Sequence, residues 1–152
     1  MIAVVVNMYC YEVDDNLKHL FAFRHGVHLG LFSVEEVVSW AEALFEDNHI
    51  PDEWMIQLVI AQSSDDVVQA VDPILSYGSE EEVWTTLKTL LCKAMKNKTI
   101  SSYGILQYAA TYAPEGEISN DIFYLLLSFD DLEQGYGSLE EIDAEILKFL
   151  KK

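Results

Sequence analysis

Hydrophobic and polar positions recur with the period of an α-helix along most of this chain. After Ser33, apolar side chains return every three or four residues, and the residues between them are mainly glutamate and serine. The stretches after Ser79 and after Ser138 repeat this division. The pattern predicts amphipathic helices that each bury one face and expose an acidic one.

The same three serines predict where these helices begin. Ser33, Ser79 and Ser138 are each followed, three residues later, by a glutamate. In this arrangement the serine hydroxyl accepts a hydrogen bond from the third residue's N–H, and the glutamate reaches back to the serine N–H. The three starts are unevenly spaced, so they define no fixed repeat.

Two further segments are apolar nearly all round, which is typical of central helices. They are PDEWMIQLVIA, opened by Pro51 at a first-turn position, and Asn120–Phe129. Three more helices are expected near 14–28, over 64–75 with an interruption at Pro73, and over 101–113.

The whole pattern predicts an all-α fold of about eight helices joined by short turns, as an irregular bundle or a short α-solenoid. A single helical domain is expected over residues 1–152, because no linker or low-complexity stretch interrupts the chain. One short strand is an alternative at the start, where IAVVV is rich in β-branched residues.

The N-terminal residues and the cysteines indicate the cellular compartment. The opening residues 1–13 lack a cation before their apolar stretch and a cleavage site after it, so no secretory signal is expected. No run approaches the roughly 20 apolar residues that span a bilayer. Cys10 and Cys92 stand far apart and predict neither a disulfide framework nor a zinc site. We expect a cytoplasmic protein.

The distribution of charge restricts the classes of binding partner. The chain carries 26 Asp and Glu against 9 Lys and Arg, a formal net charge of −17, and it has no Lys or Arg from His25 to Leu87. Proteins that bind nucleic acid directly present basic patches, and anionic membranes repel an acidic surface. The charge therefore disfavours both partners and favours a basic protein.

Catalytic and metal-binding patterns are weak. His25 and His28 could approach a metal together, with His19 nearby, but Gly26 and Gly30 interrupt the helix that this would need. No nucleophile motif or phosphate-binding loop occurs. We predict no catalytic residue, metal or cofactor, and keep an enzyme built from His25, His28 and distant carboxylates as the third alternative.

The segment from Asp130 to Glu141 resembles a calcium-binding EF-hand loop in part. Asp, Gly and Glu stand at its first, sixth and last positions, but Leu132 replaces an oxygen ligand at the third. A second interpretation accounts for every residue: Gly135 ends one helix and Ser138 caps the next. We favour the second interpretation.

The acidic region is thus the best candidate for a binding surface, with aromatic residues as anchors. Trp54 follows two acids and Trp40 lies at the edge of an apolar face, although core packing is the alternative for both, because large aromatic residues are mostly buried. A surface that merely keeps the protein soluble is another alternative. The predicted partner-binding residues are Glu35, Glu42, Glu46, Asp47, Asp52, Glu53, Trp54, Asp65 and Asp66.

The stretch SVEEVVSWAEALFEDNHIPDEWMIQLVIAQSSDDV and the closing FDDLEQGYGSLEEIDAEILKFL resemble small all-helical bacterial immunity proteins of polymorphic or contact-dependent toxin systems. The resemblance covers Leu29 to Leu150 and includes a Trp-Ala pair and a Gly-Tyr-Gly turn. It implies stoichiometric inhibition of a toxin domain, often a basic nuclease, by a protein that mimics nucleic-acid charge. The alternative function is a solenoid-like scaffold or adaptor in a bacterial assembly.

Overall fold

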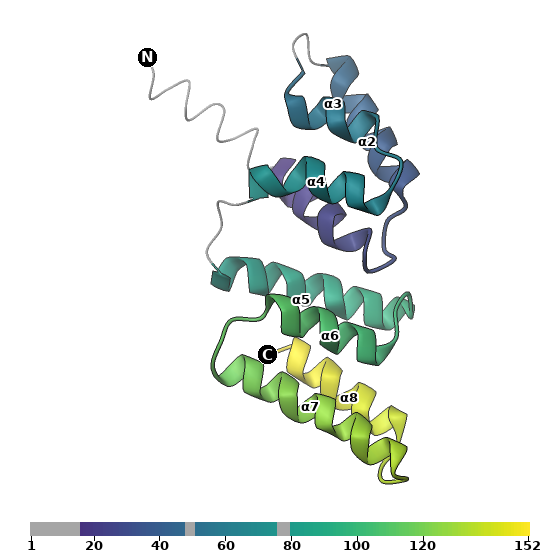
Figure 1. Cartoon of the computed structure of the whole chain (residues 1–152), viewed down its shortest axis with the longest axis vertical. Helices are drawn as coiled ribbons and strands as arrows, with labels where there is room; N and C mark the ends of the chain where they lie inside the picture. Colours follow the sequence, from purple (N-terminus) through teal and green to yellow (C-terminus); the bar gives the residue numbers. More distant parts are fainter. Residues whose placement is uncertain (1–15, 48–50, 76–79) are drawn as a thin grey trace. The chain divides into compact units, whose positions relative to one another are not determined.

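The computed structural model describes residues 16–47, 51–75 and 80–152, and within them every regular element is a helix (Figure 1). The all-α prediction is confirmed, and the eight helices of this part match the expected number. The strand considered for residues 1–13 lies outside the described residues.

The chain divides into two compact units. Unit 1 comprises Met1–His28 and Phe32–Tyr77, and unit 2 comprises Leu29–Leu31 and Gly78–Lys152. Each unit is described by itself below, and the single domain expected over residues 1–152 stays a prediction.

Unit 1 contains a helix over 16–26, followed by α2 (Val34–Asp47), α3 (Glu53–Val59) and α4 (Ser64–Leu75). The short α3 packs against both α2 and α4. Burial follows from the apolar face of each helix, because side chains three and four residues apart share one side. The buried core is made by Leu20, Phe23, Val27, Val37, Ala41, Leu58, Ala61, Val67, Ala70 and Val71.

Aromatic rings fill one part of this core. The rings of Phe32 and Trp40 each meet that of Phe23 edge-on, with centroids 5.1 Å apart in both pairs. Trp40 in turn stacks on Trp54, whose ring centroid lies 6.3 Å away. Such pairs add about 0.5–1.5 kcal/mol each beyond the area they bury.

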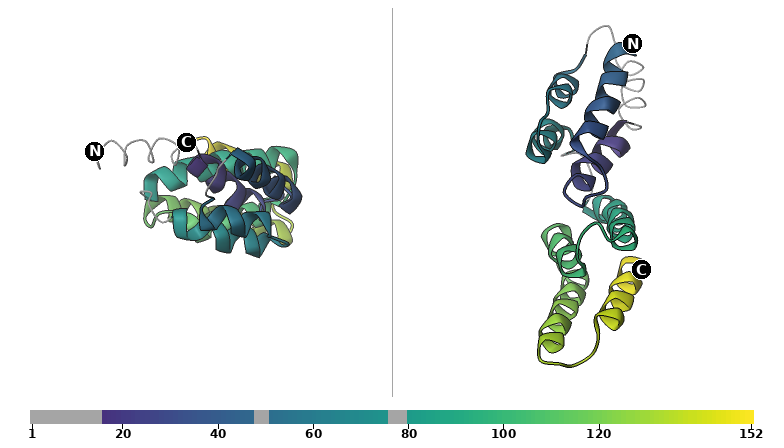
Figure 2. Two further views of the ribbon diagram at one scale, coloured as in Figure 1. Left: turned by 90° about the horizontal axis from the view of Figure 1, so that it is seen from above. Right: turned by 90° about the vertical axis from the view of Figure 1, so that its right-hand side faces the viewer.

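Unit 2 is a four-helix bundle of α5 (Glu80–Asn97), α6 (Ser102–Tyr112), α7 (Glu117–Glu133) and α8 (Leu139–Leu150). Each helix packs against the next, and α8 packs back against α5. In Figures 1 and 2, α7 (light green) and α8 (yellow) lie side by side. Short connections between these helices favour antiparallel neighbours, as in up-and-down bundles.

The predicted helix starts agree with the structure where it describes them. At α2, Ser33 Oγ accepts from Glu36 N at 3.2 Å, and the Glu36 carboxylate accepts from Ser33 N at 3.0 Å. At α8, Ser138 Oγ accepts from Glu141 N at 3.2 Å. Ser79 lies outside the described residues.

Two proline predictions are wrong. Pro51 does not stand in the first turn of a helix, because α3 begins at Glu53 and Asp52 is its N-cap. Pro73 does not interrupt α4, which runs on to Leu75. A proline this close to a helix end disturbs little of the backbone ladder, and the carbonyl that loses its N–H partner belongs to the exposed Gln69.

The prediction that α7 is a central helix is also wrong. Among its residues only Ile122 is fully buried, whereas Phe123, Tyr124 and Leu127 are 57%, 67% and 40% exposed. The apolar pattern was correct, but α7 has helices α6 and α8 as its packing neighbours and leaves its other side uncovered. The other segment expected to be central, α3, buries Met55 and Leu58 but exposes Ile56 by 45%.

Candidate functional site

The predicted partner-binding carboxylates all lie in unit 1, where each of their side chains is exposed. We call them the acidic surface, which consists of Glu35, Glu42, Glu46, Asp47, Asp52, Glu53, Asp65 and Asp66. Within the described residues none of them takes part in an ion pair, whereas Arg24 pairs with Asp72 at 2.8 Å. Among the described residues, no neighbouring cation therefore offsets the charge of the acidic surface.

Helix α2 carries the longest row of this surface. Glu35, Glu42 and Glu46 are spaced by seven and four residues, which brings them to one side of a helix. Val37 and Ala41 are fully buried on the side that packs against the core. Asp47 is the last residue of α2. Because it directly follows Glu46 in the helix, it lies on a different side from this row.

The remaining acids lie at the starts of α3 and α4. Asp52 is the N-cap of α3 and Glu53 is its first residue, while Asp65 and Asp66 belong to the first turn of α4. Helix α3, with 7 residues, and the connection that follows it lie between the two pairs in the chain. The structure thus spreads the predicted residues over three helices.

Asp66 has a structural role that the sequence interpretation missed. Its carboxylate accepts from Gln62 N at 2.9 Å and from Ser63 N at 3.2 Å, while Asp66 N donates to Ser63 Oγ at 3.2 Å. This is a capping box at the start of α4, and the Ser63-x-x-Asp66 spacing was the available signal. The hydrogen bond from Gln62 N, with those from Ser63, lowers the pKa of Asp66 and keeps it ionised.

A shallow hollow of about 440 Å³ adjoins this cap. Its walls combine three amide side chains with the Asp66 carboxylate and the exposed Ile60. The residues are Gln57, Ile60, Ala61, Gln62, Asp66 and Gln69. Amide oxygens beside an ionised carboxylate can accept hydrogen bonds from a Lys or Arg side chain.

Trp54, the predicted aromatic anchor, is half-buried and packs on the unit 1 core through its stack with Trp40. Its position therefore supports the alternative of packing at the core edge, while part of its side chain stays open to solvent.

His25 and His28, the two candidate metal ligands, differ in burial. His25 is 3% exposed and contacts the Phe21 ring at a centroid distance of 4.5 Å, whereas His28 is exposed. Burial lowers the pKa of His25 from 6.5 to about 3, with a further contribution from the neighbouring Arg24. Across residues 16–47, 51–75 and 80–152, no three His, Cys, Asp or Glu residues are placed to hold a metal ion.

The segment that resembles an EF-hand forms a helix end and a cap. Asp130 and Glu133 still belong to α7, Gly135 has φ +90°, and Ser138 caps α8. The favoured interpretation of this segment agrees with the structure.

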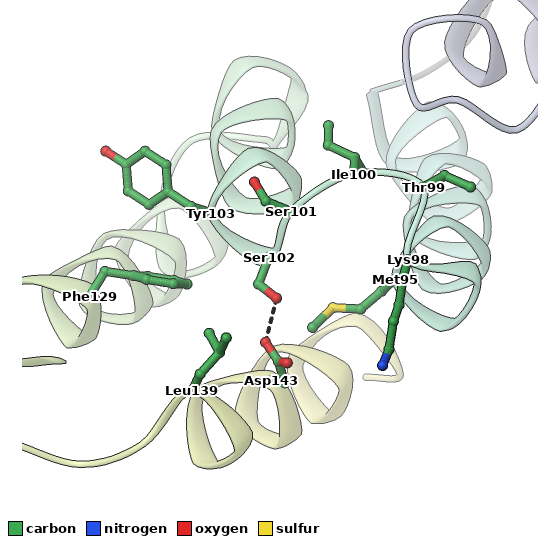
Figure 3. A pocket seen from close by; sticks show the side chains of 10 residues that line it. All are labelled: Met95, Lys98, Thr99, Ile100, Ser101, Ser102, Tyr103, Phe129, Leu139 and Asp143. Atoms are coloured by element: carbon green, nitrogen blue, oxygen red, sulfur yellow. Dashed lines mark hydrogen bonds between the residues drawn. The ribbon is translucent and has the colours of Figure 1, made fainter.

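Unit 2 has a pocket of about 500 Å³ at the start of α6 (Figure 3). Its residues are Met95, Lys98, Thr99, Ile100, Ser101, Ser102, Tyr103, Phe129, Leu139 and Asp143. The Ser102 hydroxyl donates to the Asp143 carboxylate and so ties α6 to α8. The residues that line this pocket include no histidine, so the pocket itself offers Ser102 no imidazole that could activate it as a nucleophile.

In the described part of the chain, no helix combines the length and the apolar character needed to cross a bilayer. Comparisons with protein families, with curated protein sequences and with solved structures find no match to this chain. The resemblance to immunity proteins stays a prediction, and the functional proposal rests on the chain's own surface chemistry.

Proposed function

We propose that this chain is a protein-binding module whose acidic surface captures a basic protein partner. In line with the sequence resemblance, the partner is a toxin domain that the chain neutralises by stoichiometric binding, as an immunity protein does. One observation carries the proposal: eight exposed carboxylates lie on three packed helices of unit 1, and none is neutralised by an ion pair within the described residues.

The physical basis is electrostatic attraction between complementary surfaces. A field of one sign speeds association with a basic protein, and it weakens as salt screens it over about 8–10 Å. Affinity needs desolvated anchors as well, and the exposed part of Trp54, together with the hollow beside Asp66, offers such contacts. A basic toxin domain that normally binds nucleic acid would meet the same charge on this surface.

The test uses Glu42→Lys with Glu46→Lys, which reverses two neighbouring charges on the exposed side of α2. The matched control is Glu140→Lys with Glu145→Lys, the same change on exposed positions of α8 in unit 2. Tagged wild-type protein and both variants are used to capture partners from source cells at low and high salt, and mass spectrometry identifies what is retained.

We expect a basic protein in a one-to-one complex with the wild type and the control. The α2 variant should retain at least about tenfold less of it at low salt, and the amount it retains should depend less on salt. Equal capture by all three proteins, or partners without basic character, would remove the acidic surface from the interface.

A further inference from the structure

Helix α7 carries two apolar faces, and the bundle uses one of them. The inner face repeats at helical spacing and is buried or half-buried in unit 2 through Ile118, Ile122, Leu125, Leu126, Phe129 and Leu132. Phe123, Tyr124 and Leu127 lie on the other side of the helix and are exposed. Large apolar side chains that touch water at adjacent helical positions form a contiguous patch, and such patches are typical of interaction surfaces.

The charges around these residues restrict what can cover them. Glu117 and Asn120 precede the three apolar residues on the same side of α7, and Asp130 and Asp131 follow them. We call this row the outer stripe of α7, and it consists of Glu117, Asn120, Phe123, Tyr124, Leu127, Asp130 and Asp131, all exposed. It has an apolar centre with carboxylates at both ends, about 21 Å apart along the axis.

Beyond Tyr124, toward α8, the charges are mixed. A hollow of about 290 Å³ there contains Glu145, Lys148 and Lys152. Lys152 pairs with Asp121 at 4.0 Å, so one of these cations is already partnered. Lys148 of α8 and Lys152 after its end share this hollow with Tyr124, so cations border one edge of the outer stripe of α7, whereas both of its ends carry carboxylates.

We propose that the outer stripe of α7 is a docking site for an amphipathic basic helix of a partner protein. The partner helix would place apolar side chains on Phe123, Tyr124 and Leu127, and Lys or Arg residues near its two ends would face the carboxylates of α7. Helix-on-helix packing of this kind uses apolar residues at three- and four-residue spacing, which the stripe presents. The proposal concerns unit 2 and does not depend on the acidic surface of unit 1.

Charge also argues against a second copy of this chain as the occupant. An antiparallel pair of α7 helices would set Asp130 and Asp131 against Glu117 of the other copy, and a parallel pair would set each acid against itself. Like charges opposed in this way are destabilising, and each copy brings a net charge of −17. A basic helix replaces this repulsion with attraction.

The probe is a fluorescent peptide of about 18 residues, in which leucines form one helical face and lysines the rest, long enough to cover α7. A peptide with glutamate in place of lysine has the same apolar face and the opposite charge. Fluorescence anisotropy gives the affinity of each peptide for the full chain, and circular dichroism confirms that every variant is folded.

We expect the Leu/Lys peptide to bind and the Leu/Glu peptide not to bind. Phe123→Ser with Leu127→Ser should weaken binding at least about tenfold. The matched control, Ile56→Ser with Ile60→Ser, changes two exposed apolar residues at the same four-residue spacing, one on α3 and one at its C-cap, and it should change affinity less than about twofold. Glu42→Lys with Glu46→Lys should also leave it nearly unchanged, which separates this result from the proposed function.

A second variant tests the charged ends. Asp130→Lys with Asp131→Lys should weaken the Leu/Lys peptide and reduce its salt dependence, while Leu/Glu peptide binding improves. The proposal is overturned by absent Leu/Lys binding, by equal losses in the α7 and α3 variants, or by unchanged binding after the Asp130 and Asp131 substitutions. The proposal would also be overturned, in favour of a second copy as the occupant, if sedimentation showed a dimer of the wild type that dissociates in Phe123→Ser with Leu127→Ser.

Discussion

The two units carry the same number of acids and very different surfaces. Each has thirteen Asp and Glu residues in its sequence, but unit 1 has two Lys or Arg and unit 2 has seven. Unit 1 buries its aromatic cluster of Phe23, Phe32, Trp40 and Trp54 wholly or in part, while unit 2 leaves Phe123 and Tyr124 exposed on α7. Unit 1 therefore offers a partner many carboxylates with separate exposed apolar residues such as Phe45 and Ile60, and unit 2 offers adjacent apolar residues on α7 with carboxylates at both ends.

Substitution of two neighbouring residues of α7 is the sharpest test of this comparison between covered and exposed apolar residues. Ile122→Ala should lower the free energy of unfolding by about 2–5 kcal/mol, because Ile122 is 1% exposed and its removal leaves a cavity. Phe123→Ala should cost less than about 1 kcal/mol, since the Phe123 side chain already meets water. Urea unfolding followed by circular dichroism measures both, and equal losses would mean that the outer face of α7 is packed.

Urea unfolding followed by tryptophan fluorescence tests the single domain expected over residues 1–152. Trp84 reports on unit 2 and Trp40 and Trp54 report on unit 1. A single domain predicts one transition that moves with Ile122→Ala at all three reporters. Two separate transitions in a Trp84→Phe comparison would contradict that prediction.

A pH effect should be specific to unit 1. His25 stays neutral in the folded protein because its pKa is lowered to about 3, whereas the unfolded chain takes up a proton near 6.5. The stability that the neutral His25 contributes is therefore fully present above about pH 6.5, and it is lost progressively as the pH falls toward 3. We expect a loss of about 2 kcal/mol between about pH 7 and pH 5.

His25→Gln should flatten this dependence, even if it lowers stability at neutral pH. The control is His28→Gln, which removes an exposed imidazole and should leave the slope nearly unchanged. Thermal unfolding of the three proteins across this pH range provides the measurement. A slope that is the same in all three would show that His25 is not the titrating group.

Removal of a helix-capping serine should lower the free energy of unfolding by the same amount in the two units. Ser63→Ala removes the acceptor for Asp66 N in unit 1, and Ser101→Ala removes the acceptor for Gly104 N in unit 2. Each should cost about 1 kcal/mol of unfolding free energy. Ser39→Ala, an exposed position inside α2, is the control and should change stability by less than about 0.5 kcal/mol. A large difference between the two caps would show that one helix start depends on tertiary contacts.

The smallest expected effect is an increase in the free energy of unfolding from one substitution in unit 2. Lys98 follows α5 with φ +54°, a left-handed conformation that costs an L residue free energy. Lys98→Gly should raise the free energy of unfolding by about 0.5–1 kcal/mol, and Lys93→Gly inside α5 should lower it by a similar amount. A loss of stability in Lys98→Gly would mean that the Lys98 side chain contributes more than its backbone costs.

Local signals were reliable where they concern neighbours in sequence. The serine caps at Ser33 and Ser138 and the turn at Gly135 follow from hydrogen bonds and backbone angles within a few residues, so the sequence predicts them. The missed cap at Ser63 had the same signal with aspartate in place of glutamate. The proline predictions failed because one depended on where α3 begins and the other on where α4 ends.

The sequence by itself determined the helical class, the excess of negative charge, and the acids that line the exposed sides of the unit 1 helices. Tertiary structure decided which apolar faces are covered, because a helix with apolar residues all round is compatible with burial or with an open face. It placed His25 in the core and left the outer stripe of α7 exposed, since both depend on neighbours far away in the chain. Hydrophobic periodicity reports which side chains favour burial, and packing determines which of them achieve it.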